Sequence, residues 1–250
     1  MVAAPETPLP LDLARPKLDL PPPYTLVTLR ERGDAFSHAC RLAPENGAGT
    51  FVHVGRFDLL EFAVVLEPEE PLAFARRAFF AGMVALGDAI AAHCPPEKPL
   101  AFAWPDTIFF DGAVIGGARF GWPEGPEDAV PDWLVFGAQL TAARVGMSEA
   151  GLLPGSTSLE EEGFEETRAV AESFARHLMV AFDTWREKGF APLAQEYLRR
   201  LTGGEGETRR IDPKGDLLVQ DGKAAPVRRA LVPALKEVAW FDAERGGPKL

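Results

Sequence analysis

The stretch that decides the fold is Phe102–Gly117, which reads FAWPDTIFFDGAVIGG. It starts with a short apolar run and turns at Trp104-Pro105-Asp106. Next comes Thr107–Phe110, whose β-branched and aromatic residues favour a strand, and then an Asp-Gly dipeptide typical of tight turns. A second strand-like run, Ala113–Phe120, follows. We therefore expect a β-hairpin that is entered through a Trp-Pro turn.

The composition of the 250-residue chain is that of a soluble globular protein, with 46% apolar and 25% charged residues. The net charge of −11 argues against a nucleic-acid partner, because proteins that bind the phosphate backbone concentrate lysine and arginine. No apolar run approaches the roughly 20 residues of a membrane span, and prolines and charges interrupt the N-terminus where a signal peptide needs an apolar stretch. We expect a cytoplasmic protein without a membrane segment, in which Cys40 and Cys94 are free thiols.

The rest of the chain divides into a lead, a main domain and a small module. The proline-rich residues 1–23 predict an extended lead that builds no core. In the main domain, over 24–202, apolar spacing predicts a long amphipathic helix over 70–93 and helices over 34–43, 164–188 and 192–201. Further strands are predicted at 24–29, 50–54, 59–66, 100–103 and 133–140. After a glycine-rich linker, strand-like pieces that include 227–231 and 238–241 predict a small all-β module over 203–250.

The Trp-Pro stretch resembles the active-site hairpin of the biotin/lipoate–protein ligase family, which reads Lys-Trp-Pro-Asn-Asp, a strand, a turn and Lys-x-x-Gly. Two further segments support the resemblance. Thr157–Glu162 with the helix after it and Gly189–Leu193 is similar to the end of the family's catalytic domain, and Arg210–Val219 is similar to its C-terminal barrel. The resemblance covers Tyr24 to Phe241. It implies an α+β fold with a mixed, largely antiparallel sheet covered by helices, followed by a small SH3-like β-barrel.

Members of that family join biotin to ATP as an acyl-adenylate and then pass the acyl group to a lysine of an acceptor domain. The resemblance thus implies ATP with Mg²⁺, biotin or lipoate, and a biotinyl or lipoyl acceptor domain. The charged residues of the pattern are missing, however. Ala113 stands where the family has its catalytic lysine, and Ala103 replaces the lysine before the tryptophan. The Arg-rich glycine loop is reduced to Gly47–Thr50 or to Gly55-Arg56-Phe57, although Asp34 fits the acidic position before the first helix.

Each candidate ligand-binding residue has two interpretations, one functional and one structural. Trp104 stacks on a ligand or packs in the core, and Asp106 holds a metal or a ligand amine or else caps a turn. The pair Gly116-Gly117 admits a ligand to the backbone or marks a bulge. In a continuous strand Arg119 shares a face with position 113, about 20 Å along it at roughly 3.3 Å per residue, unless the glycines bend the strand. The candidate set is Arg56, Trp104, Asp106, Gly116, Gly117 and Arg119.

Two functions follow from these residues. The first is an atypical ligase that binds a biotin- or lipoate-like carboxylic acid and transfers it to an acceptor lysine. The second is a catalytically inactive relative that binds such an acid or a carrier protein. The sequence identifies no catalytic residue, and the four histidines show no metal-ligand spacing, so we expect no metal site of the protein's own. It leaves open whether the protein forms a homodimer.

Overall fold

The computed structural model describes residues 17–30, 33–144, 153, 155–204 and 206–249. Its centre is a seven-stranded sheet in the order β1-β2-β3-β7-β6-β5-β4, in which β1 runs parallel to β2 and the other neighbours are antiparallel. The strands are β1 Thr25–Leu29, β2 Thr50–Val54, β3 Leu59–Leu66, β4 Leu100–Ala103, β5 Thr107–Phe110, β6 Ala113–Gly121 and β7 Leu134–Thr141. This confirms the α+β fold with a mixed, largely antiparallel sheet, and it confirms the hairpin of β5 and β6.

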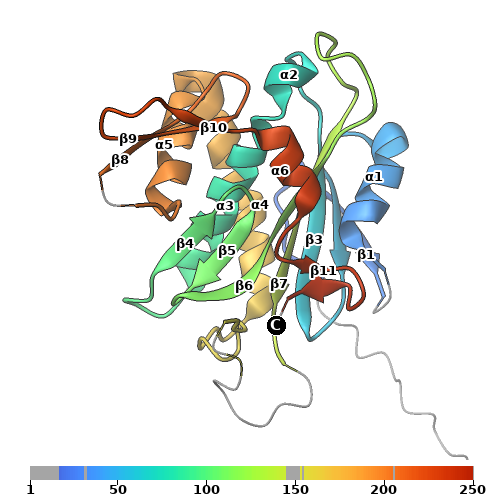
Figure 1. Ribbon diagram of the computed structural model, residues 1–250. Coiled ribbons are helices and arrows are strands. Elements are labelled where there is room, and N and C mark those ends of the chain that lie inside the picture. Colours follow the sequence, from blue (N-terminus) through green and yellow to red (C-terminus); the bar gives the residue numbers. More distant parts are fainter. Residues whose placement is uncertain (1–16, 31–32, 145–152, 154, 205, 250) are drawn as a thin grey trace, which may run out of the picture.

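Helices cover both faces of the sheet (Figure 1). The helices of the main domain are α1 Ala35–Asn46, α2 Leu72–Ala75, α3 Ala78–His93, α4 Thr167–Lys188 and α5 Ala191–Arg200. The large core includes side chains of α3, α4 and α5 on one face, and α1 packs on the other face against Val52, Val54 and Val135. We call these the α3 face and the α1 face. Among the described residues, no helix is long and apolar enough to cross a membrane.

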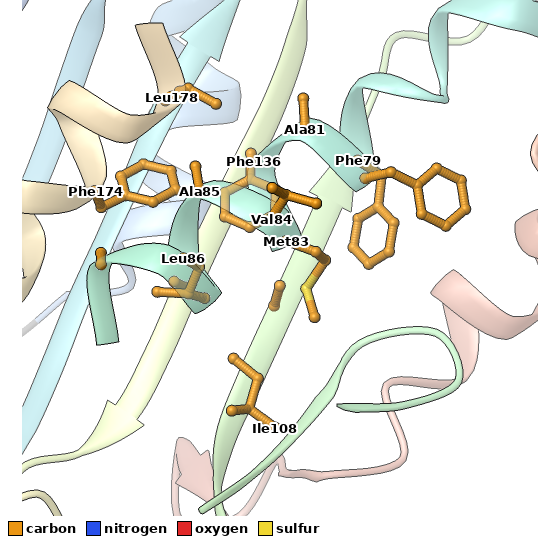
Figure 2. Close-up of a cluster of buried hydrophobic side chains, with 14 of the residues drawn as sticks. Phe79, Ala81, Met83, Val84, Ala85, Leu86, Ile108, Phe136, Phe174 and Leu178 are labelled. Carbon is orange, nitrogen blue, oxygen red and sulfur yellow. The ribbon is translucent and has the colours of Figure 1, made fainter. Parts of the chain in front are cut away.

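The α3 face carries a continuous apolar core (Figure 2). Phe136 of β7 stacks on Phe174 of α4 with ring centroids 5.5 Å apart. A Cβ added to Gly82 of α3 would lie 2.2 Å from the Phe136 ring, so the missing side chain lets the helix approach the sheet. The prediction of one amphipathic helix over 70–93 is wrong on two points. The helix breaks between Ala75 and Ala78, and α3 is buried on nearly every side because the sheet, α4 and α5 all pack against it.

The α1 helix begins as its sequence predicts. Asp34 is the N-cap, and its side chain accepts a hydrogen bond of 2.7 Å from the backbone N–H of Ser37. This cap fixes the start of α1 above the first half of β3, where the N–H of Ala35 donates to the Glu61 carboxylate at 2.6 Å. The α1 face is therefore the face on which polar side chains are buried.

The C-terminal region is only partly the expected all-β module. It contains β8 Glu207–Ile211, β9 Leu217–Asp221, β10 Val227–Arg229, α6 Leu231–Glu237, β11 Phe241–Asp242 and β12 Gly247–Pro248. The helix α6 replaces the end of one predicted strand, because Leu231 and Leu235, four residues apart, are both buried on one side of it. The strands form a three-stranded and a two-stranded sheet, and β12 returns to contact β6 and β7. The small sheets were expected, whereas their closure into a barrel and the boundary at residue 203 stay predictions.

Candidate functional site

The Trp-Pro turn packs against the helices of the α3 face. The peptide bond between Trp104 and Pro105 is cis, and the carbonyl of Pro105 accepts a 2.7 Å hydrogen bond from the hydroxyl of Tyr197 in α5. The Trp104 ring lies 6.1 Å from Phe80 and 6.2 Å from Tyr197, centroid to centroid. This position favours the packing role of Trp104 over the stacking role. Its indole Nε1 is nevertheless buried without a hydrogen-bond partner.

Asp106 is the titratable group of the turn, and its residue is 1% exposed. Its Oδ1 accepts a long hydrogen bond of 3.4 Å from the hydroxyl of Thr107, and its Oδ2 has no partner. Burial raises the pKa of Asp106 to about 7, against the opposing effect of the nearby Trp240 and Thr107 donors. A carboxyl group with this pKa is able to release or take up a proton near neutral pH.

Both glycines of β6 are required by close contacts. Gly116 has φ 153°, and a Cβ there would lie 2.1 Å from the carbonyl oxygen of Gln139. A Cβ on Gly117 would lie 2.4 Å from the indole nitrogen of Trp240 and 2.5 Å from the carbonyl oxygen of Asp106. Gly116 therefore serves the approach of two strands, and Gly117 leaves room for an aromatic ring.

A bulge in β6 changes the expected direction of its side chains. The register with β5 shifts so that Ile108 is paired with Gly116 but Phe109 is paired with Val114. Ala113 then lies opposite Phe110, which is part of the α3-face core, whereas Arg119 lies opposite Gly137 beneath α1. The prediction that positions 113 and 119 share a face is wrong, because the extra residue of the bulge reverses the alternation of the strand.

Arg119 lies on the α1 face and is held there by several groups. Its Nη2 is 2.7 Å from Oδ2 of Asp34, and its guanidinium lies over the rings of Phe36 and Phe241 at 4.7 and 5.0 Å. Burial alone would raise the pKa of Asp34, but the hydrogen bond from Ser37 and the charge of Arg119 together lower it. Asp34 and Arg119 thus form an ion pair between the start of α1 and the middle of the sheet.

The centre of the α1 face holds Glu61 and Gln139, which the sequence reasoning missed. They are paired in register on β3 and β7, and each is 2% exposed. Gln139 Nε2 donates to Glu61 Oε2 at 3.2 Å, and Gln139 Oε1 has no partner. Burial raises the pKa of Glu61. A sequence signal existed, since each is a lone polar residue inside a run of apolar strand residues.

Two further arginines lie at the end of the sheet where β2 and β7 end and β3 begins, which we call the loop end. Each of them is close to a carboxylate. Arg56, in the connection from β2 to β3, donates to both oxygens of Asp58, at 2.9 Å from Nε and 2.5 Å from Nη2. Arg144 follows β7, and its side chain is 5% exposed. It donates from Nη2 to the hydroxyl of Ser156 at 3.0 Å and has Nε 3.2 Å from Oε2 of Glu161. Arg144 is a second residue that the sequence reasoning missed.

The C-terminal segment, residues 239–249, lies on the same α1 face, in front of the sheet in Figure 1. Trp240 is 3% exposed, and its Nε1 donates to the carbonyl oxygen of Ala118 at 3.3 Å. Gln139 Nε2 also donates to the carbonyl oxygen of Gly246 at 3.0 Å. The polar centre of this face is therefore covered by the chain itself.

Comparison with known proteins agrees with this arrangement. The family model for the biotin/lipoate A/B protein ligase family matches residues 20–199. This chain belongs to the biotin/lipoate A/B protein ligase family. It is 28% identical over 196 residues to the biotin–[acetyl-CoA-carboxylase] ligase of Paracoccus denitrificans, which covers 68% of this chain and 76% of the relative.

Solved structures of this ligase family have the same fold. A biotin protein ligase-like protein of unknown function from a Silicibacter species superposes with a TM-score of 0.74 at 26% identity, over 89% of this chain and 99% of the other. The apo biotin protein ligase of Aquifex aeolicus superposes with a TM-score of 0.65 at 16% identity, over 84% and 97% of the two chains. The second likeness shows the fold alone.

The six candidate residues from the sequence analysis fall into two groups by their position in the structure. Asp106 and Gly117 lie directly beside Trp240, Arg119 contacts the neighbouring Phe241 ring, and Gly116 packs against Gln139 and Leu140 of β7 instead. Trp104 points toward the α3 face, and Arg56 lies at the loop end beside Asp58. Among the described residues, no group of histidine, cysteine, aspartate and glutamate has the arrangement of a metal site.

Proposed function

We propose that this family member binds a biotin- or lipoate-like carboxylic acid, or the carrier domain that bears one, without converting the acid into an acyl-adenylate. The observation that carries the proposal is the charge balance of the α1 face and its loop end. Arg56, Arg119 and Arg144 lie within 2.5 to 3.2 Å of carboxylate oxygens of their own chain. Their charge is largely neutralised before any ligand arrives.

Adenylation makes the opposite demand on a site. A carboxylate and a triphosphate must be brought together, and the charge that develops on the α-phosphate must be stabilised by preorganised cations. Losing one such group costs about 3 kcal/mol, or a hundredfold or more in rate. Ala113 offers no charge at the family's lysine position, and Glu61 and Asp106 add buried acidic groups. The described residues thus do not fit ATP with Mg²⁺, and we derive no step through either.

The α1 face fits the recognition of a neutral or weakly charged head group better than that of a phosphate. Gln139 Oε1 and Asp106 Oδ2 are buried acceptors without partners, and an N–H donor of a ligand satisfies either of them. The space over Gly117 accommodates a flat ring with an N–H donor, because the indole of Trp240 lies in it and donates to the carbonyl oxygen of Ala118. The acid's carboxylate then remains toward the rim, where Arg56 lies 24% exposed.

A second candidate function is ligation itself, with transfer of the acid to an acceptor lysine. The likeness to the Paracoccus denitrificans biotin ligase favours it, since 28% identity extends over 68% of this chain. That function requires Arg119 or Arg56 to leave its carboxylate and take the place of the missing lysine.

Calorimetric titration with biotin, lipoate and octanoate, combined with ATP–pyrophosphate exchange assays, distinguishes the two functions. We expect saturable binding of at least one acid and no exchange above background with any of them. Asp34→Asn is the informative variant, since it releases Arg119 from its carboxylate, and Asp183→Asn on the outer surface of α4 is its matched control. Exchange by the unmodified protein would show that it forms an acyl-adenylate, which contradicts the proposal, and failure of all three acids to bind would reject this ligand class.

A further inference from the structure

The C-terminal segment occupies the part of the α1 face where the proposed ligand would lie. The Trp240 indole fills the space above Gly117, where a Cβ would be only 2.4 Å from its nitrogen. It donates to a backbone carbonyl of β6, as the N–H of a bound molecule would. The guanidinium of Arg119 lies over the next ring, Phe241, at 5.0 Å. The segment therefore uses the contacts available to a ligand on this face.

Most of the hydrogen bonds of this segment are internal. Lys249 donates to Trp240 O at 2.8 Å from its backbone and to Ala239 O at 2.5 Å from its side chain, and Gly246 donates to Asp242 O at 2.9 Å. Between described residues, its hydrogen bonds to the sheet are those from Trp240 to Ala118 O and from Gln139 to Gly246 O. The segment is thus able to leave the sheet as a unit while its internal bonds stay formed.

The residue before this segment is a suitable hinge. Val238 has φ 40° and ψ 60°, the left-handed conformation that a β-branched residue rarely adopts. On its N-terminal side, α6 is fixed by buried Leu231 and Leu235 and by a 2.9 Å hydrogen bond from the N–H of Leu231 to Asp216. Strain is therefore stored where the anchored helix meets the separately bonded segment.

We propose that residues 239–249 form a displaceable cover over the α1 face, with Trp240 as its anchoring side chain. An acid or carrier domain then binds only after this cover moves away from the sheet. The part that concerns the ligand rests on the proposed function. The displacement of the cover is a property of the ligand-free chain and is testable without any acid. Binding is then weakened in proportion to the fraction of molecules whose cover is open.

The first test follows the indole N–H signals of the full-length protein labelled with ¹⁵N-tryptophan. The Trp240→Phe variant assigns the Trp240 signal by its disappearance. We expect the Trp240 N–H to exchange with solvent at least tenfold faster than global unfolding allows, because the cover opens while the core stays folded. The free energy of unfolding from a denaturant titration sets the exchange expected through global unfolding. If the Trp240 N–H exchanges no faster than that, the proposal is overturned, whichever acids bind.

The second test measures affinity for biotin, lipoate and octanoate in full-length variants. Trp240→Ala removes the anchor, and we expect it to bind the active acid at least tenfold more tightly than the unmodified protein. Trp240→Phe, which keeps a ring but loses the donor, should lie between them and also serves if the alanine variant does not fold. Trp185→Ala, at the end of α4 where the ring packs against Phe182 and Phe190 on the α3 face, is the matched control and should leave affinity unchanged.

Equal or weaker affinity in Trp240→Ala and Trp240→Phe overturns the proposal. So does a titration in which the acid saturates the unmodified protein while the Trp240 N–H signal and its exchange stay unchanged. If no acid binds any variant but Trp240 exchanges by local opening, the cover is supported and the proposed acid ligand fails. The two results are therefore distinguishable.

Discussion

The two faces of the central sheet differ in what they bury. On the α3 face, strand side chains such as Phe62, Phe136 and Leu140 meet an apolar layer of helices. On the α1 face, the neighbouring positions of the same strands carry the buried residues Glu61 and Gln139, and Oε1 of Gln139 lacks a hydrogen-bond partner. Burying polar groups lowers stability unless they are fully paired, so a sequence selected for stability alone would not place them there. The apolar α3 face is the main source of stability, and the buried polar pair is the reason why we propose ligand recognition on the α1 face.

The largest expected effect comes from damaging the α3 face. Phe136→Ala removes a fully buried ring that contacts Phe174 and covers Gly82. We expect the free energy of unfolding, measured by denaturant titration, to fall by about 3–5 kcal/mol. Phe57→Ala is the matched control, because Phe57 is 65% exposed. An equal loss in both variants would show that the α3 face is not the main source of stability.

The pH dependence of stability tests the burial of Asp106. Its usual pKa of 3.8 is raised to about 7, so the folded protein holds a proton that the unfolded chain has released between these pH values. Stability should be fully present below pH 4 and decline until about pH 7, by roughly 4 kcal/mol at most at about 1.4 kcal/mol per pKa unit. Asp106→Asn should flatten this decline in a series of thermal melts, whereas Asp111→Asn in the exposed turn should not. An unchanged slope in Asp106→Asn contradicts the prediction.

Substitutions of Glu61 should change the free energy of unfolding by a smaller amount, and two of them separate the role of its charge from that of its hydrogen bonds. Glu61→Ala leaves the N–H of Ala35 and the amide of Gln139 without acceptors, which should cost about 1–3 kcal/mol of unfolding free energy. Glu61→Gln keeps an acceptor and removes a carboxyl group whose pKa is raised by burial, so its loss should be smaller. The difference between the two variants should be measured at one pH above neutrality. Identical losses would show that the acceptor does not matter.

The smallest effect is expected at the hinge. Val238→Gly relieves a left-handed conformation that costs roughly 1–2 kcal/mol for a side-chain-bearing residue. Because glycine also loses more entropy on folding, we expect a net gain of about 1 kcal/mol or less, and slower exchange of the Trp240 N–H. Lys236→Gly inside α6 should instead destabilise the protein, and a gain there would rule out relief of strain as the cause.

The strands of the main sheet and the start of α1 were predictable because their signals are local. β-Branched and aromatic residues mark β5, the Asp-Gly turn marks the hairpin to β6, and Asp34 marks a helix start. The full burial of α3 was not predictable, because it depends on α4, a segment distant in the sequence, packing over it. The sequence predicts a continuous strand over β6, and the glycine pair after Ile115 only suggests a bulge as the alternative.

The composition of the site was harder to predict than the fold. The family pattern directs attention to the positions where its lysines are missing, whereas Glu61 and Gln139 lie in strands that otherwise read as apolar core. The position of Trp240 depends on the chain returning to the sheet more than one hundred residues after β6. A local sequence pattern does not encode such a contact. The pairing of Arg119 with Asp34, 85 residues apart, was invisible for the same reason.

The account depends most on the claim that Arg56, Arg119 and Arg144 stay paired with carboxylates of their own chain and are not released to a nucleotide. Equilibrium binding of ATP with Mg²⁺ to the full-length protein, with and without biotin, tests the claim directly. We predict no saturable binding at millimolar nucleotide. Saturable binding in the micromolar range that is lost in Arg119→Ala or Arg56→Ala would show that a paired arginine is released for the phosphates, and it would contradict the account.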